Sequence, residues 1–152
     1  MEEIILVVKR QADDILANMG LEGESIIAME NRTVLVNVDV EDPALLIGRG
    51  GEGLESFQHI LRLLVSEALL SNDLDLVVDI AGYRKKRASN LTRTAKEKAY
   101  QVLATGLPEI LPPMSSYERR IVHMVCSNIA EIETESMGEG RLKKVKIKPK
   151  KL

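Results

Sequence analysis

Two short segments of the sequence combine residue types that suit the binding of an anion. Residues 45–54 run Leu-Leu-Ile-Gly-Arg-Gly-Gly-Glu-Gly-Leu, so an apolar stretch passes into a glycine-rich turn around the cation Arg49. Glycine admits positive φ and lets a ligand approach the backbone closely, and amides at the start of a following helix favour negative charge. The turn therefore predicts contact with a phosphate group.

The second segment places Arg119 and His123 four positions apart, with Arg120 beside them. Residues i and i+4 share one face of a helix, and the apolar residues of this helix point elsewhere: Ile121, Val122 and Val125. We therefore expect the imidazole to be exposed. Arginine presents a planar fork of donors to phosphate, and histidine adds a donor or, below its pKa of about 6.5, a positive charge. Arg119, Arg120 and His123 are the predicted contacts.

The glycine turn admits three interpretations. Residues 48–53 match G-x-G-x-x-G, the dinucleotide fingerprint, but that motif needs a strand leading directly into the first glycine. Here the nearest predicted strand ends near Val40, and Pro43 opens a helix instead. In the other register, Gly48 to Gly51 form the G-x-x-G loop that holds about four backbone nucleotides in a KH module. A plain turn between helices accounts for Gly48 but not for four glycines in six positions.

A run of cations opens a long predicted helix: Arg84, Lys85, Lys86 and Arg87. The helix dipole disfavours positive charge at that end. The run therefore indicates phosphate binding, and the alternative is a solvated helix face.

The lysines near the C-terminus have a structural alternative. Three lysines of one predicted strand and three glutamates of its partner each share a face: Lys144, Lys146, Lys148, Glu131, Glu133 and Glu135. Opposite charges across a hairpin stabilise each other. Pairing within the hairpin therefore competes with a role in ligand binding, whereas Lys150 and Lys151 have no such predicted partners.

Enzymatic and metal chemistry find little support. Cys126 follows His123 by three residues, which could suggest a cysteine–histidine nucleophile. The spacing of the sequence, however, supplies no third residue that would orient the histidine, and a lone cysteine is usually a small apolar residue. The two histidines, His59 and His123, are too scattered for a metal site. We expect no enzyme, no cofactor and no bound metal.

The composition indicates a globular protein with two modules. Of the 152 residues, 45% are apolar and 3% aromatic, so a core can form while base stacking cannot dominate affinity. Residues 1–81 hold five basic and sixteen acidic residues, a net charge of −11, and residues 82–152 hold sixteen basic and seven acidic ones, a net of +9. The asymmetry predicts a second module drawn to polyanions, and attraction between the halves is the alternative.

Other features bear on location. No apolar run approaches the ~20 residues of a membrane span, and the acidic start Met1-Glu2-Glu3 differs from the basic start of a signal peptide. A single cysteine excludes an intrachain disulfide. We expect a cytoplasmic protein that does not insert into membranes.

Periodicity predicts the elements that must position these residues. In the first module the order is α-β-β-α-α-β, with helix 3–19, strands 25–29 and 33–40, helix 43–47, a helix of about five turns over 54–68, and strand 74–81. The first helix has one apolar face: Ile5, Val8, Ala12, Ile15 and Met19. The second module begins near Gly82, with helix 83–105, edge strand 109–111, a helix from Ser115 or Ser116 to Ser127, and strands 129–136 and 142–148.

With these motifs in this order, the sequence resembles the bacterial Jag (SpoIIIJ-associated) family, which joins a type II KH domain to an Arg-x-x-x-His, or R-3-H, domain. The resemblance rests on residues 45–54, 82–84, 113–114, 117–123 and 133–140 and covers nearly the whole chain. It implies an α+β fold with a KH domain over 1–81 and a small α+β R-3-H domain over 82–152. It also implies that the loop holds a nucleic-acid backbone through Ile47, Gly48, Arg49, Gly50 and Gly51, and that Arg119 and His123 contact phosphate of a single strand.

Two departures from the family pattern matter. Many members carry an additional N-terminal Jag domain, whereas this sequence begins at the predicted KH helix, so we do not carry over any role of that domain with membrane-associated partners. Many members also have two basic residues in the loop, whereas this chain has Arg49 and Gly50. We expect one phosphate contact fewer there.

The sequence therefore predicts a non-enzymatic protein that binds single-stranded RNA, with single-stranded DNA as an alternative ligand. The resemblance implies a post-transcriptional regulator or RNA chaperone linked to the cell envelope or to division. The alternative is an adaptor that docks a partner KH protein, as a homo- or heterodimer, with RNA secondary. A nucleotide-dependent enzyme is a third class, which we do not expect.

Overall fold

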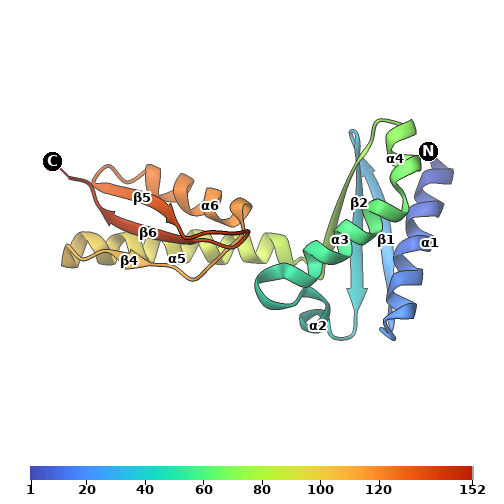
Figure 1. The fold of residues 1–152 in the computed structure, drawn as a ribbon, viewed down its shortest axis with the longest axis horizontal. Helices are drawn as coiled ribbons and strands as arrows, with labels where there is room; N and C mark the ends of the chain where they lie inside the picture. The colour runs from blue at the N-terminus through green and yellow to red at the C-terminus, as the bar shows by residue number, and fades with distance from the viewer. Residues whose placement is uncertain (152) are drawn as a thin grey trace. The chain divides into compact units, whose positions relative to one another are not determined.

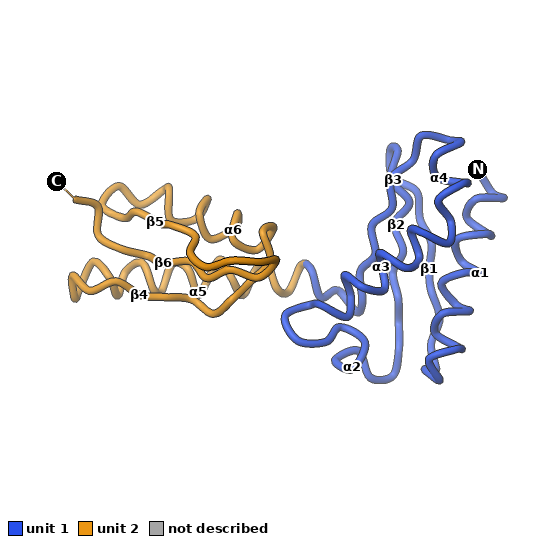
Figure 2. Tube along the Cα trace, in the orientation of Figure 1, with its two compact units in different colours: residues 1–84 blue, residues 85–152 orange. Residues whose placement is uncertain are grey.

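The computed structural model describes residues 1–151 of the chain. The chain divides into two compact units, residues 1–84 and 85–152 (Figure 2). The division lies between Arg84 and Lys85, just beyond the boundary predicted near Gly82, and helix α5 (Tyr83–Thr105) contributes to both units. No helix within residues 1–151 is both long and apolar enough to cross a membrane.

The first unit has the predicted order of elements, except that two helices take the place of the last predicted helix (Figure 1). They are α1 (Glu2–Asn18), β1 (Gly23–Glu30), β2 (Thr33–Val40), α2 (Pro43–Ile47), the 3-10 turn η1 (Arg49–Gly51), α3 (Glu52–Leu64), α4 (Ser66–Ser71) and β3 (Asp75–Ile80). β1 and β2 are antiparallel, β2 and β3 are parallel, and the sheet order is β1-β2-β3. A parallel pair needs a crossover connection, and the segment from α2 to α4 supplies it.

One face of this sheet carries the core of the first unit. Alternate residues of β2 and β3 are buried together with α1 and α3: Val34, Val36, Val38, Val40, Leu76, Val78 and Ile80. Side chains of a strand alternate between its faces, so Asn37 and Asp39 of β2 lie on the opposite face and are exposed. The half-buried pattern predicted for residues 33–40 is confirmed.

Two predictions for the helices of this unit were wrong in detail. α1 buries Ile4 and Leu16 at the ends of its apolar stripe. Met19, which was predicted to lie on the apolar face of this helix, is 55% exposed. Because Ile4 and Ile5, and Ile15 and Leu16, are adjacent apolar pairs, the sequence allows either member of each pair to be buried, and packing against the sheet selects Ile4 and Leu16.

The predicted single helix over 54–68 is two helices that meet at Val65, where φ is −107°. The buried i, i+4 spacing continues through that bend, so periodicity could not reveal it.

The second unit is a three-stranded antiparallel sheet with two helices on one core. Its elements are the remainder of α5, β4 (Glu109–Ile110), α6 (Ser116–Ser127), β5 (Ile132–Met137) and β6 (Lys144–Pro149). The sheet order is β4-β6-β5, which makes β5 an edge strand. Side chains from every layer share the core, among them Leu91, Ala95, Val102, Val122, Cys126, Val145 and Ile147.

A capping box fixes the start of α6. Ser115 Oγ accepts a hydrogen bond from the Glu118 amide at 3.3 Å, and Glu118 Oε2 accepts one from the Ser115 amide at 2.9 Å. Glu118 is only 5% exposed, and its Oε1 also accepts from Arg87 Nε at 2.6 Å. Of the two serines that the sequence offered as caps, the structure selects Ser115.

We expect Ser115→Ala to lower the free energy of unfolding of the second unit by about 1 kcal/mol, because the capping oxygen is lost. Urea denaturation followed by circular dichroism measures the change. Ser116→Ala is the matched control, since that exposed side chain begins the helix but makes no capping hydrogen bond. Equal losses for both variants would contradict the assignment of the cap.

Candidate nucleic-acid interface

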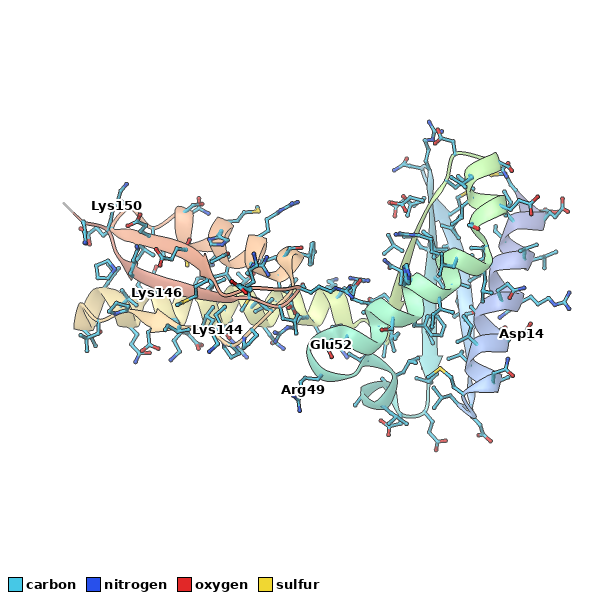
Figure 3. All side chains as sticks on the ribbon, viewed as in Figure 1. Asp14, Arg49, Glu52, Lys144, Lys146 and Lys150 are labelled. Carbon is cyan, nitrogen blue, oxygen red and sulfur yellow. The ribbon has the colours of Figure 1, made fainter. Side chains whose placement is uncertain are left out.

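The glycine turn of the first unit leaves its one cation free. Gly48, Gly50 and Gly51 adopt φ values of +71°, +59° and +84°, which turn the chain sharply between α2 and α3. Arg49 is exposed at this turn, and Figure 3 shows its side chain extending away from the helices. None of the ion pairs found within residues 1–151 involves Arg49. The turn therefore presents an unpaired guanidinium to solvent.

The glycines of the turn differ in what surrounds them. A Cβ at Gly53 would lie 2.1 Å from the carbonyl oxygen of Leu46, and one at Gly48 would lie 2.9 Å from the Gly53 nitrogen. These two glycines are required because α2 and α3 approach closely there. Gly50 has no atom within 4 Å of its Cβ position. Open space therefore lies beside Arg49 at this turn.

Helix α6 brings the second predicted cluster together. Arg119, Arg120 and His123 line one open groove of about 440 Å³, together with Ser116, Met124, Ser127 and Ser136. Arg120 is exposed, and Arg119 donates through Nη1 to the Met114 carbonyl at 2.9 Å. A guanidinium has five donors, so this bond orients Arg119 without using up its donors. The groove can thus hold an anion beside two arginines.

His123 is half-buried, whereas the sequence predicted it to be exposed. Its Nδ1 lies 2.6 Å from Thr134 Oγ1 and its Nε2 lies 2.9 Å from Ser136 Oγ. Burial lowers the pKa of His123, and the positive charge of Arg119 lowers it further. The imidazole is therefore mostly neutral near pH 7, and it joins α6 to β5 instead of supplying a cation.

Thr134 and Ser136 also belong to this cluster and were not predicted from the sequence. They stand two positions apart in a predicted strand, so they share one of its faces. That pattern showed two hydroxyls on a common face. Only the packing of α6 against β5 shows that this face meets His123.

Two cations of the predicted basic run have structural partners. Arg84 donates to the Val78 carbonyl at 2.8 Å, to Glu55 at 3.1 Å and to Gln58 at 3.1 Å, so it joins α3 to β3. Arg87 is held by the buried Glu118. These bonds orient both arginines inside their own units and leave fewer donors for phosphate, so their predicted phosphate contacts stay a prediction. Lys85 and Lys86 are exposed.

The hairpin of the second unit pairs charges across its strands. Glu133 lies opposite Lys148, and Glu135 lies opposite Lys146. Lys148 Nζ donates to Glu135 Oε2 at 2.7 Å, which lowers the pKa of Glu135. Figure 3 places Lys144 and Lys146 on the same strand, and Lys144 lies opposite Met137. The structural alternative is confirmed for the Lys148–Glu135 pair.

Cys126 is 1% exposed within the core of the second unit. Burial raises the pKa of its thiol, so the thiolate is disfavoured at neutral pH. A reactive cysteine needs an accessible thiolate. The structure therefore supports the interpretation of Cys126 as a small core residue.

Comparison with known proteins identifies the family. Residues 89–149, which include the α6 groove, match the R-3-H domain family. The chain is 30% identical over 124 residues to the RNA-binding protein KhpB of Lactiplantibacillus plantarum, which covers 82% of this chain and 38% of that protein. The chain belongs to the KhpB (Jag) family. The resemblance predicted from the sequence is thereby confirmed.

Two further members of the family show the same extent of similarity. The KhpB proteins of Clostridium symbiosum and Bacillus subtilis are 35% and 34% identical to this chain, over 76% and 80% of it. The matched segments make up 52% and 60% of those proteins. The chain thus spans about half the length of the family members it matches.

We expect the pKa of His123, measured by NMR titration, to lie below its ordinary value of about 6.5. Arg119→Gln should raise that pKa, because one of its two causes is removed. Arg120→Gln, the neighbouring cation, is the control and should change it less. A lowered pKa in the fold means that the unfolded chain binds the proton more readily. His123 therefore contributes stability above about pH 6.5 that is lost as the pH falls below it.

Proposed function

We propose that this chain binds single-stranded RNA by its sugar-phosphate backbone. The observation that carries the proposal is the groove in which Arg119 and Arg120 lie together beside an open surface, within the segment that matches the R-3-H domain. The family members compared above are named RNA-binding proteins. A planar guanidinium binds phosphate through two parallel hydrogen bonds, so a pair of them suits a phosphodiester chain. Single-stranded DNA is the alternative ligand of the same groove.

The glycine turn is the second proposed contact. We assign the first unit to the type II KH fold on the basis of three features: its β1-β2-β3 sheet, a G-x-x-G turn between two helices, and an α-β-β-α-α-β order in which α3 and α4 together take the place of one helix. In this assignment residues 47–51 hold the nucleic-acid backbone, with Arg49 as their one cation. Because one chain carries both contacts, binding at either one raises the local concentration of RNA at the other.

The electrostatics of the chain agree with this assignment. Its net charge is −2, but residues 82–152 carry a net charge of +9, so attraction to a polyanion is concentrated in the second unit. Lys85 and Lys86 are exposed and add to the arginines of the second unit. Affinity that comes from phosphate neutralisation falls steeply with salt. We infer a non-catalytic, cytoplasmic role in post-transcriptional regulation or as an RNA chaperone, linked to the envelope or to division.

A second candidate function is that of an adaptor that docks another KH protein or a second copy. The observation that favours it is a set of exposed apolar side chains on α3 and α4. Ile60, Leu63, Leu64 and Leu70 are 47%, 61%, 54% and 81% exposed. Contiguous exposed apolar residues are typical of protein interfaces. Such docking is compatible with RNA binding, because these residues lie outside both proposed contacts.

Arg119→Ala with Arg120→Ala should weaken the binding of a labelled single-stranded RNA by about tenfold per lost charge-assisted contact. The slope of log K against log salt should fall by about 1.4, since each phosphate contact on a single strand contributes roughly 0.7. Fluorescence anisotropy at several salt concentrations measures both quantities. Arg93→Ala with Lys96→Ala removes the same charge from α5 and serves as the control. Equal weakening by the control would show general electrostatics instead of a groove.

Two double variants test the turn. One carries Arg49→Asp with Gly50→Asp, and its control carries Arg49→Asn with Gly50→Asn. Both pairs fit the open space at Gly50, and Asp and Asn tolerate its positive φ. The two double variants differ only in negative charge. We expect the aspartate pair to weaken RNA binding several-fold more than the asparagine pair, because it repels phosphate. Matching affinities in folded proteins would exclude the turn as a contact.

A further inference from the structure

The hydrogen-bond register of the second sheet leaves part of β5 without a neighbouring strand. On one side of β6, the Leu111 amide donates to the Val145 carbonyl at 2.9 Å, and Met114 and Lys143 exchange two backbone hydrogen bonds. In an antiparallel ladder, alternate residues of a strand bond to opposite neighbours. Odd-numbered residues at the start of β6 therefore face β4, and even-numbered residues face β5.

The same alternation fixes the directions of the peptide groups of β5. Glu133, Glu135 and Met137 lie opposite the even-numbered lysines of β6 and bond to them, as does Glu131, whose carbonyl accepts from the Lys150 amide at 2.8 Å. The N–H and C=O groups of Thr134 and Ser136 consequently point away from β6. Because β5 is the edge of the sheet, no strand within residues 1–151 pairs with these groups.

This free edge borders the α6 groove. Ser136 lines the groove together with Arg119 and Arg120. The bonds from His123 to the hydroxyls of Thr134 and Ser136 hold this part of the strand in place. A rigid pair of backbone donors and acceptors therefore stands beside two cations.

The charges around the edge set the direction from which an anion can approach. Glu133 and Glu135 are exposed on the face of β5 that points away from α6. They repel phosphate there, whereas the arginines attract it on the α6 side. Met124 is 62% exposed in the groove and offers an apolar, polarisable surface to a flat ring.

We propose that the free edge of β5 at Thr134 and Ser136 recognises a nucleobase of the strand whose phosphate Arg119 and Arg120 hold. The inference rests on the proposed function. One residue of an edge strand presents an N–H and a C=O side by side, which matches the adjacent acceptor and donor groups on the edge of a base. The groove volume of about 440 Å³ is that of a small-molecule site. Ser136 is then a specificity-determining residue, and His123 positions it.

The experiment compares the affinities of wild type, Ser136→Pro and Ser136→Ala for labelled oligo(A), oligo(C), oligo(G) and oligo(U). Proline removes the Ser136 N–H, and edge strands tolerate it where that N–H faces solvent. Alanine removes only the hydroxyl and is the matched control. We expect wild type to discriminate the best from the worst homopolymer by about tenfold, and the proline variant to lose more of that discrimination than the alanine variant while keeping the salt slope.

A measurement on the unaltered chain keeps the test decisive if the proline variant does not fold. Hydrogen exchange of the Thr134 and Ser136 amides, followed by NMR, should slow severalfold when the preferred oligonucleotide binds. Unchanged exchange, or equal affinity of wild type for all four homopolymers, would overturn this inference and leave backbone binding intact. Absence of any RNA binding by wild type would refute the proposed function itself. Protection of these amides by an added peptide strand but not by RNA would also overturn the nucleobase assignment.

Discussion

Whether a basic side chain is already paired with a carboxylate of the protein decides which parts of this surface best suit a polyanion. Arg84 and Arg87 begin the same helix as Lys85 and Lys86, yet both arginines are held by carboxylates and carbonyls of their own units. Lys148 is paired across its hairpin. Arg49 and Arg120 remain exposed, and the first of these stands on a turn that leaves open space around it. Local pairing, more than total charge, therefore defines the proposed interface.

The two proposed contacts use different ways of fixing a backbone. In the first unit, Gly48 and Gly53 let two helices meet closely, and this packing positions Arg49 on the turn. In the second unit, a capping box starts α6, and His123 joins that helix to β5. In both cases the packing or hydrogen bonding of neighbouring residues holds the proposed contact group in place. Rigid support of this kind lowers the entropic cost of binding.

The role of His123 illustrates how tertiary contacts change the chemistry of a motif. An Arg-x-x-x-His helix suggests two groups that act alike on phosphate. Once both imidazole nitrogens engage hydroxyls of β5, the histidine becomes a fixed, neutral connection between helix and strand. The arginines of α6 then carry the charge, while the strand that His123 holds carries unpaired backbone groups.

The sequence by itself determined the order of elements, the glycine turn, the shared face of Arg119 and His123, and the family. Each of these follows from local spacing, because periodicity and turn chemistry act over a few neighbouring residues. Only the tertiary structure decided that α1 buries Ile4 and Leu16, that Arg84 and Arg87 are paired, and that His123 meets Thr134 and Ser136. Those outcomes depend on which distant segments pack together. No local pattern contains that information, because the sequence around an apolar or charged residue is the same whichever distant segment packs against it.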